Sequence, residues 1–143
     1  MKLRSIFVGA ARRALASDRA AAFLLGSLYV IWLLLTARSL GFARDEGFYF
    51  SASSSYARWF ELLVERGADA LKRSSVDGVW SQNHEHPALM KTLFAFSWLL
   101  FHEKWRIFAD ASTAFRFPGM CMGGLLVGTT YLFGARALSR RAG

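Results

Sequence analysis

The sequence contains a single cysteine, Cys121, among its 143 residues. A disulfide framework or a cysteine-based zinc site needs at least two cysteines, so neither can form within one chain. Cys121 lies inside an apolar run, where a small packing residue is expected rather than a reactive thiol.

Acidic residues are also scarce, since ten Asp and Glu stand against eighteen Lys and Arg and the net charge is +8. Such a balance is typical of nucleic-acid-binding proteins when the charge gathers on one polar domain. Here it gathers beside apolar runs: residues 1–19 carry five basic residues and one acidic residue, whereas residues 38–86 carry six basic and seven acidic. This distribution is typical of a membrane protein and argues against a nucleic-acid partner.

The first apolar run, residues 20–37, contains no charge and lies between Arg19 and Arg38. Roughly 20 apolar residues are enough to cross the hydrocarbon core of a bilayer. A signal peptide would have a shorter apolar core of about 7–15 residues followed by a small-residue cleavage site, and no clear Ala-x-Ala follows this run. We therefore expect an uncleaved span with a basic N-terminal segment in the cytoplasm.

Two further apolar runs follow a long polar loop. In that loop, apolar residues recur at helical spacing from residue 55 to 72, which predicts an amphipathic helix resting at the membrane interface or packed on a soluble domain. His86 and Pro87 open the second run, and proline is favoured in the first turn of a helix. The Asp77-Gly78 pair predicts a turn.

These patterns predict an all-α, polytopic membrane protein with about three spans. The predicted segments are a cytoplasmic N-terminal segment (1–19), a first span (20–40), an extracytoplasmic loop with its juxtamembrane helix (41–86), a second span (87–101), a short cytoplasmic loop (102–115), a third span (116–137) and a tail (138–143).

The third run holds Gly124 and Gly128 in a Gly-x-x-x-Gly pair. Small residues at this spacing let helices pack closely in lipid, although glycine is also common in spanning helices generally. Three spans would place the basic residues that follow, Arg136, Arg140 and Arg141, outside, against the positive-inside tendency. Either only two runs span, or the orientation is set by a longer protein; the abrupt end of the chain favours the second interpretation.

Two polar constellations could carry chemistry. Asp45 and Glu46 are adjacent carboxylates flanked by aromatic residues, which could raise a carboxyl pKa and suit a general base; the alternative is a solvated turn. His84, Glu85 and His86 precede the second run and could bind a divalent metal or stabilise a phosphate; the alternative is a polar helix cap. Because the first predicted span exits and the second enters on one side, both constellations are expected at the same membrane face.

The order of these parts resembles the N-terminal region of membrane glycosyltransferases of the GT-C class. The resemblance extends to the ArnT-like, protein O-mannosyltransferase-like and Rgt-type families, and it covers about residues 20–141. It rests on three short motifs in order: DEGFY from Asp45, HPAL from His86, and FRFPG from Phe115 through YLFGAR ending at Arg136. The second motif lacks the second proline of the family pattern.

The resemblance implies a polyprenyl-phosphate sugar donor and transfer outside the cytoplasm, at a bacterial inner membrane. Asp45 would be the catalytic base with Glu46 beside it, and Glu85 and His86, with His84, would contact the donor phosphate or a metal. Arg116 matches the arginine of the third motif, but the predicted topology places it on the cytoplasmic side as a structural anchor. Because these enzymes are several times longer, the chain is expected to be an N-terminal fragment, a truncated reading frame or a degenerate relative, and to be inactive alone.

Two other functions fit the same sequence. One is a small non-catalytic scaffold or subunit whose glycine-rich third helix packs against partner membrane helices. The other is a transporter component, because Lys91 is a charged residue within an apolar run.

Overall fold

The computed structural model describes residues 2–41 and 43–138, with side chains from residue 17 onward except Arg38. The chain is 85% helix, and no strand occurs among the described residues, which confirms the predicted all-α class. It divides into two compact units: unit 1 consists of Met1–Leu35 with Gly119–Gly143, and unit 2 is Thr36–Pro118.

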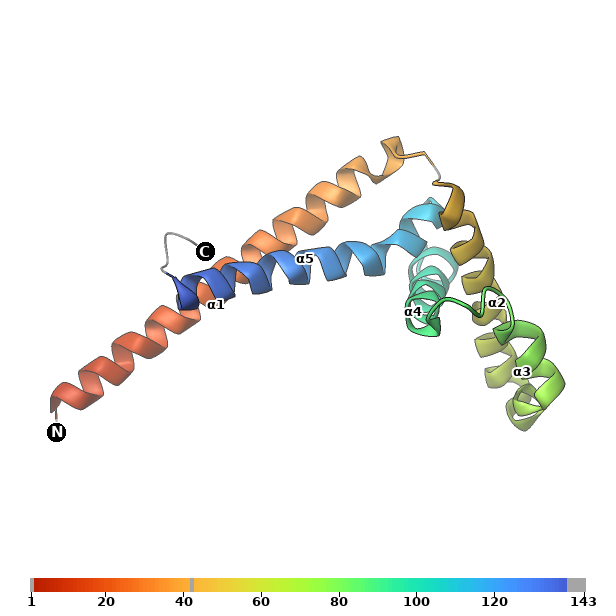
Figure 1. Cartoon of the computed structure of the whole chain (residues 1–143), viewed down its shortest axis with the longest axis horizontal. Helices are drawn as coiled ribbons and strands as arrows, with labels where there is room; N and C mark the ends of the chain where they lie inside the picture. The colour runs from red at the N-terminus through yellow and green to blue at the C-terminus, as the bar shows by residue number, and fades with distance from the viewer. Residues whose placement is uncertain (1, 42, 139–143) are drawn as a thin grey trace. The chain divides into compact units, whose positions relative to one another are not determined.

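Unit 1 is built from two long helices, α1 (Lys2–Thr36) and the greater part of α5 (Ala111–Ala137) (Figure 1). Within α1, Ser17–Thr36 has a mean hydropathy of 1.7. By length and composition it is the one helix among the described residues that could cross a membrane. This agrees with the first predicted span to within a few residues.

The two helices of unit 1 run antiparallel and meet at their small residues. A Cβ added to Gly26 would lie 2.6 Å from the carbonyl oxygen of Gly124, and one added to Gly128 would lie 3.0 Å from that of Ala22. Residue numbers thus rise on one helix as they fall on the other. The Gly-x-x-x-Gly pair of the sequence packs against α1 of the same chain.

Unit 2 is a packed group of shorter helices: α2 (Arg44–Arg66), α3 (Arg73–Trp80) and α4 (Ala88–Trp98). A 3₁₀ turn, Ala37–Ser39, follows α1, another, Gly67–Leu71, joins α2 to α3, and a π-helical segment, Leu99–Lys104, continues α4. The core consists of buried Tyr56, Ala57 and Ala95, surrounded by larger side chains that pack against them: Phe60, Val79, Trp80, Trp98 and Leu99.

Two local predictions differ from the structure. The loop helix begins at Arg44 rather than at residue 55, because Ala43 caps it and the Glu46 side chain accepts a hydrogen bond from the Ala43 amide. The Asp77-Gly78 pair lies inside α3 and not in a turn. An ion pair between Arg73 and Asp77, one turn apart, supports that helix.

The segment predicted as a second span forms a short helix in unit 2. α4 has 11 residues and its π-helical continuation has 6. At no more than 1.5 Å per residue, the two together are at most about 25 Å long, shorter than a hydrocarbon core of about 30 Å. The Lys91, Ala95 and Ser97 residues of α4 are buried. Its most numerous tertiary contacts are with α2. Pro87 caps it, as its place in the sequence predicted.

Pro118 lies inside α5, two turns after the helix begins. Proline has no N–H, so the carbonyl four residues earlier, that of Ala114, loses its helical partner. The buried hydroxyl of Ser97 in α4 donates to this carbonyl at 2.6 Å. The acceptor that Pro118 leaves unsatisfied is therefore satisfied by a neighbouring helix, and α5 continues into unit 1.

Candidate functional site

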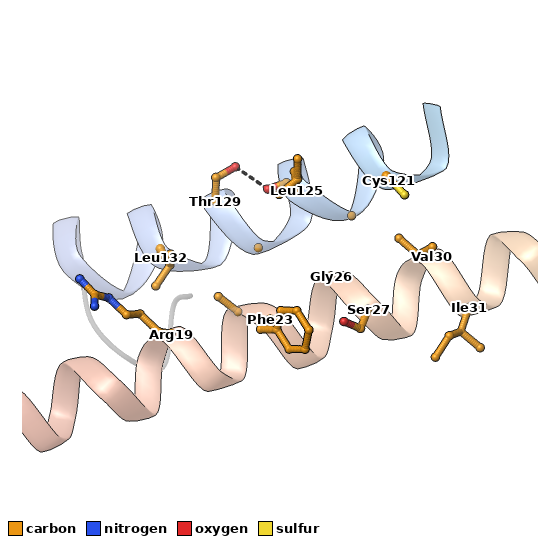
Figure 2. Close-up of a pocket in the computed structure, with 13 residues that line it drawn as sticks. Arg19, Phe23, Gly26, Ser27, Val30, Ile31, Cys121, Leu125, Thr129 and Leu132 are labelled. Carbon is orange, nitrogen blue, oxygen red and sulfur yellow. Dashed lines mark hydrogen bonds between the residues drawn. The ribbon is translucent and has the colours of Figure 1, made fainter. Parts of the chain in front are cut away.

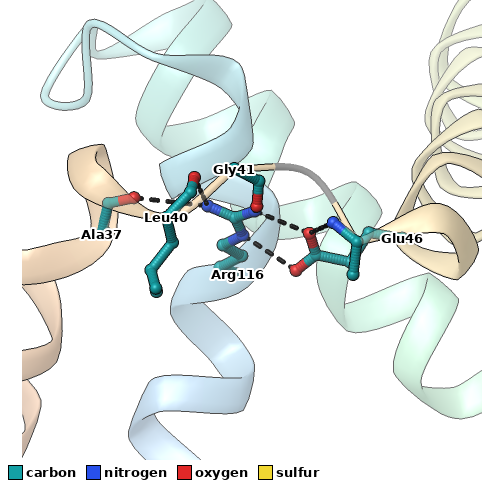
Figure 3. Close-up of polar contacts among 6 residues, drawn as sticks. Ala37, Leu40, Gly41, Glu46 and Arg116 are labelled. Carbon is teal, nitrogen blue, oxygen red and sulfur yellow. Dashed lines mark hydrogen bonds and ion pairs between the residues drawn. The ribbon is translucent and has the colours of Figure 1, made fainter.

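A bidentate ion pair joins Glu46, in the first turn of α2, to Arg116 in α5 (Figure 3). Arg116 Nη2 lies 2.6 Å from Glu46 Oε2, and Arg116 Nε lies 2.9 Å from Glu46 Oε1. The planar guanidinium presents parallel N–H groups that match a carboxylate, which a lysine cannot do. The Arg116 side chain is 11% exposed and that of Glu46 is 30% exposed, so water screens this ion pair only in part.

The same guanidinium also binds the segment that leaves α1. Its Nη1 donates to the carbonyls of Ala37 at 3.3 Å and Leu40 at 3.4 Å, and its Nη2 donates to that of Gly41 at 3.1 Å. Arg116 thereby holds together the end of α1, the start of α2 and the first turns of α5. We call Arg116, Glu46 and these three carbonyls the arginine clamp.

The clamp fixes the protonation state of Glu46. Hydrogen bonding by Arg116 holds the pKa of the Glu46 carboxyl below its ordinary value, more than offsetting the effect of partial burial, and the Ala43 amide lowers it further. The expectation that nearby aromatic residues raise this carboxyl's pKa is wrong for Glu46. A carboxylate held in this way is a poor proton acceptor, and its observed contacts are with Arg116 and the Ala43 amide.

The clamp also corrects the position predicted for Arg116. The sequence placed a spanning helix between the first loop and Arg116, and therefore placed Arg116 on the opposite membrane face from Glu46. Atoms 2.6 Å apart cannot lie on opposite faces of a bilayer. The anchoring role predicted for Arg116 fits the clamp, but its side of the membrane was wrong because α4 does not separate the two residues.

Asp45 is placed differently from its neighbour. It is exposed in the first turn of α2, and its carboxylate has no hydrogen bond or ion pair within the described part of the chain. The N-terminal end of a helix favours a negative charge. Tyr49 follows one turn later on the same face of α2. Of the two predicted carboxylates, Asp45 is the one without a partner among the described residues.

His86 lies beside this face of α2. Its ring centroid is 5.2 Å from that of Tyr49, and its backbone amide donates to the carbonyl of Asn83 at 3.2 Å. The structure thus brings His86, from the far end of the polar loop, to a side chain one turn after Asp45.

His84 and Glu85 are exposed, with His84 Nδ1 3.6 Å from Glu85 Oε2. The Glu85 backbone amide lowers the pKa of its own carboxyl, and the neighbouring histidines and Lys91 add smaller effects in the same direction. No group of three or more His, Cys, Asp or Glu side chains that could hold a metal ion occurs within residues 2–41 and 43–138. Glu85 and His86 alone would need further ligands from elsewhere to hold one.

Lys91 supports the loop that carries these residues, a role that the sequence did not reveal. Its side chain is fully buried. The ammonium donates to the carbonyl of Asn83 and lies 5.4 Å from the ring centroid of Tyr56. Asn83 has a positive φ of 53°, and its side-chain Nδ2 is buried without a partner in the described structure. Only the charge of Lys91 within an apolar run could have indicated a special position.

Replacing Lys91 with methionine is expected to loosen residues 83–87 while changing overall stability little. Methionine conserves the volume of the side chain. Removing the ammonium relieves the cost of its burial but also removes its hydrogen bond to Asn83 and its contact with the Tyr56 ring, and these opposing effects nearly cancel. The Asn83 carbonyl keeps its bond from the His86 amide but loses the ammonium. Losing one such bond corresponds to about fivefold to tenfold faster hydrogen exchange at these amides.

The matched control for this change is Lys72→Met, because Lys72 is exposed and pairs with Asp69 on the surface. Hydrogen exchange measured by mass spectrometry should show no change in residues 83–87 for this variant. Equal exchange in the Lys91 variant and the unchanged protein would mean that Lys91 does not hold the loop.

Unit 1 contains an apolar groove of about 620 Å³ between α1 and α5 (Figure 2). Arg19 and Leu132 lie at one end, and Ile31 and Cys121 lie toward the other (Figure 2). Most of the lining residues are aliphatic or glycine and Phe23 adds an aromatic ring, so the groove is mostly apolar. Cys121 lines it as a small packing residue, in agreement with its place in an apolar run.

No protein-family model matches this chain, and no curated protein or solved structure matches it either. Functional assignment therefore depends on the site's own chemistry and on the sequence motifs.

Proposed function

We propose that the chain carries the acceptor-activating part of a GT-C-type membrane glycosyltransferase that uses a polyprenyl-phosphate sugar. The observation that carries the proposal is the contrast between the two adjacent carboxylates. Glu46 is held in the arginine clamp, whereas Asp45 is exposed and unpaired among the described residues. The clamp fixes the first turn of α2 and so holds the backbone of Asp45 in place.

In this proposal Asp45 is the general base. Its carboxylate takes the proton from an acceptor hydroxyl as the acceptor oxygen forms a bond to the anomeric carbon of the sugar. The bond between that carbon and the phosphate oxygen breaks, and its electron pair leaves with the polyprenyl phosphate. The acceptor can be a lipid, a glycan or a protein.

The leaving phosphate needs compensation for its negative charge. His86, beside Tyr49, is the nearest candidate to α2, and a protonated imidazole there would supply charge and a hydrogen bond. Glu85 and His86 are neighbours in the sequence, with His84 before them. A divalent metal bound partly by Glu85 and His86 would be another way to neutralise the phosphate.

We propose that unit 1 crosses the bacterial inner membrane as a helical hairpin, with the site on the periplasmic side. In this hairpin α5, which is not apolar enough to count as a span by itself, crosses while packed against α1. Two observations support two crossings rather than three. Arg116 contacts Glu46, and α4 is short and packed on α2. The antiparallel pairing also puts Arg136, one turn beyond Leu132, near the Arg19 end of the hairpin, where the positive-inside tendency would place both.

Replacing Asp45 with asparagine is expected to reduce sugar transfer by at least about 100-fold, because a positioned general base contributes that much or more. Binding of the polyprenyl-phosphate donor should be unchanged, since Asp45 acts on the acceptor. The measurement is transfer of radiolabelled sugar from the lipid donor in membranes that carry the complete enzyme.

Asp77→Asn is the matched control, because Asp77 is an exposed aspartate that pairs with Arg73 on the surface of α3. It should leave transfer unchanged. Undiminished transfer in the Asp45 variant would remove Asp45 from the mechanism, and loss of donor binding would place it in the donor site instead.

The structure weakens the specific basis of the two other functions. A scaffold that packs through Gly124 and Gly128 would need their face to be free, but these residues contact α1 of the same chain. A transporter role for Lys91 would need a membrane pathway at that residue, but Lys91 is buried against Tyr56 and Asn83 in unit 2.

A further inference from the structure

The loop between α4 and α5 exposes two large apolar side chains that alternate with two cations and follow the exposed Glu103. Trp105 is 54% exposed and Ile107 is 60% exposed. Lys104 and Arg106 alternate with them and are also exposed. We call residues 104–107 the Trp105 loop. Two exposed apolar side chains of this size so close together are unusual on a surface that faces only water.

Hydrogen bonds fix this exposure. The Trp105 amide donates to the Leu100 carbonyl at 2.9 Å, and the Phe108 amide donates to the Phe101 carbonyl at 3.0 Å. Arg106, with a φ of 51°, adopts the left-handed conformation that non-glycine residues seldom take. The backbone is held in a tight reversal, so the apolar side chains cannot turn inward without breaking it.

An aromatic cluster connects the base of this loop to α5. The ring of Phe101 lies 5.8 Å from that of Phe108 and 5.3 Å from that of Phe117, centroid to centroid, and the rings of Phe108 and Phe117 are 5.2 Å apart. Phe117 stands two residues before Gly119, where α5 enters the helical hairpin of unit 1. The loop is thus attached to the point at which the chain passes into its most apolar part.

We propose that the Trp105 loop is a membrane-docking element that inserts Trp105 and Ile107 into the interface of the leaflet facing the site. Tryptophan is favoured at the level of lipid headgroups, because its ring is apolar and its N–H is polar. Lys104 and Arg106 lie where they can contact the phosphates of anionic lipids. The alternation of two cations with two apolar groups fits a lipid surface better than a protein interface core, from which lysine is depleted.

This docking has a consequence for the site. Ser97, just before the π-helical segment, binds the Ala114 carbonyl, and Arg116 lies two residues further along α5. A loop held in the headgroup region would keep this end of α5, and with it the arginine clamp and Asp45, close to the membrane surface where a lipid-linked donor resides. The inference rests on the proposed hairpin topology but not on the proposed transfer reaction.

The test places a polarity-sensitive fluorophore on Ile107→Cys in a Cys121→Ser background, in proteoliposomes that contain phosphatidylglycerol. Nitroxide lipids labelled high on the acyl chain should quench this probe about threefold more strongly than the same probe on Gly78→Cys. Gly78 is the control because it lies on exposed α3 with open space around it. Iodide in the water should quench the two probes in the reverse order.

Two further outcomes decide the proposal. Trp105→Glu should abolish the nitroxide quenching at position 107 while circular dichroism remains unchanged, and Lys104→Gln with Arg106→Gln should remove its dependence on phosphatidylglycerol. Equal nitroxide quenching at positions 107 and 78, or iodide quenching that is stronger at 107, would overturn the docking role. Loss of sugar transfer in the Asp45 variant bears on neither result, so failure of one proposal is distinguishable from failure of the other.

Discussion

Replacing Arg116 with alanine is expected to lower the free energy of unfolding by about 3 kcal/mol, because a partly buried carboxylate loses its only charged partner in the described structure. The carbonyls of Ala37, Leu40 and Gly41 lose their bonds from Arg116 in the same change, although that of Ala37 keeps its bond from the Leu40 amide. The loss can be followed by tryptophan fluorescence during denaturant unfolding of the full chain in detergent, since Trp59 and Trp80 pack in the core of unit 2.

Adjacent carboxylates provide the matched pair of controls for this prediction. Glu46→Gln should destabilise the protein nearly as much as Arg116→Ala, whereas Asp45→Asn should change the free energy of unfolding by less than about 0.5 kcal/mol. Arg116→Lys should recover only part of the lost free energy of unfolding, because lysine keeps the charge but cannot form the bidentate pair. Equal effects of the Glu46 and Asp45 variants would contradict the distinction between a clamped and a free carboxylate.

The clamp also predicts a dependence of stability on pH. The pKa of Glu46 is lower in the folded protein than its ordinary value of 4.5, so the folded state binds this proton less readily than the unfolded state. The stabilisation is complete above pH 4.5 and is lost as the pH falls through the folded pKa. In the Arg116→Ala variant this contribution to the acid dependence should shrink to the part that comes from the Ala43 amide.

The second large effect is expected at the contact between the helices of unit 1. A Cβ on Gly124 would lie 2.6 Å from Val30 Cγ2 and 2.8 Å from the carbonyl oxygen of Gly26. Gly124→Leu therefore cannot be accommodated unless the helices separate, and we expect the antiparallel pairing to be lost. Gly124→Ala should destabilise it by about 1–3 kcal/mol, as overpacking does elsewhere.

Gly119→Ala is the matched control, because Gly119 lies in the same helix and a Cβ added there would meet nothing within 4 Å. It should be neutral or slightly stabilising, since alanine is the better helix former. The distance between spin labels on Phe23→Cys and Phe133→Cys, in a Cys121→Ser background, reports the pairing. An unchanged distance distribution in Gly124→Leu would show that the helices do not depend on this contact.

Local elements of the fold could be predicted from the sequence because their causes are local. The uncharged run between Arg19 and Arg38 matches the apolar half of α1, and Pro87 marks the start of α4. The start of α2 was placed 11 residues too late, because its first turns contain Gly47 and four serines and show no apolar period. Three of these serines, Ser53, Ser54 and Ser55, donate to carbonyls four residues earlier and fit within the helix.

The long-range parts could not be predicted, since they depend on which segments meet. Arg116 was identified by its motif, but its partner stands 70 residues away, and charge patterning alone does not pair them. The second apolar run is short, and His86 and Pro87 at its entry favoured a span; that assumption placed Arg116 on the wrong side. The role of Ser97 depends on a proline in another helix, and the role of Lys91 depends on a carbonyl in a loop.

The 70 residues between the two halves of the arginine clamp set an order of events during synthesis. Glu46 leaves the ribosome long before Arg116, so α2 must wait as a charged segment without its partner until α5 has been made. The first turn of α2, and Asp45 with it, is fixed only when α5 has left the ribosome and packs beside it. A nascent chain arrested while Arg116 is still inside the ribosome would therefore expose an unfinished site to proteases, whereas one arrested after Arg116 has emerged would not.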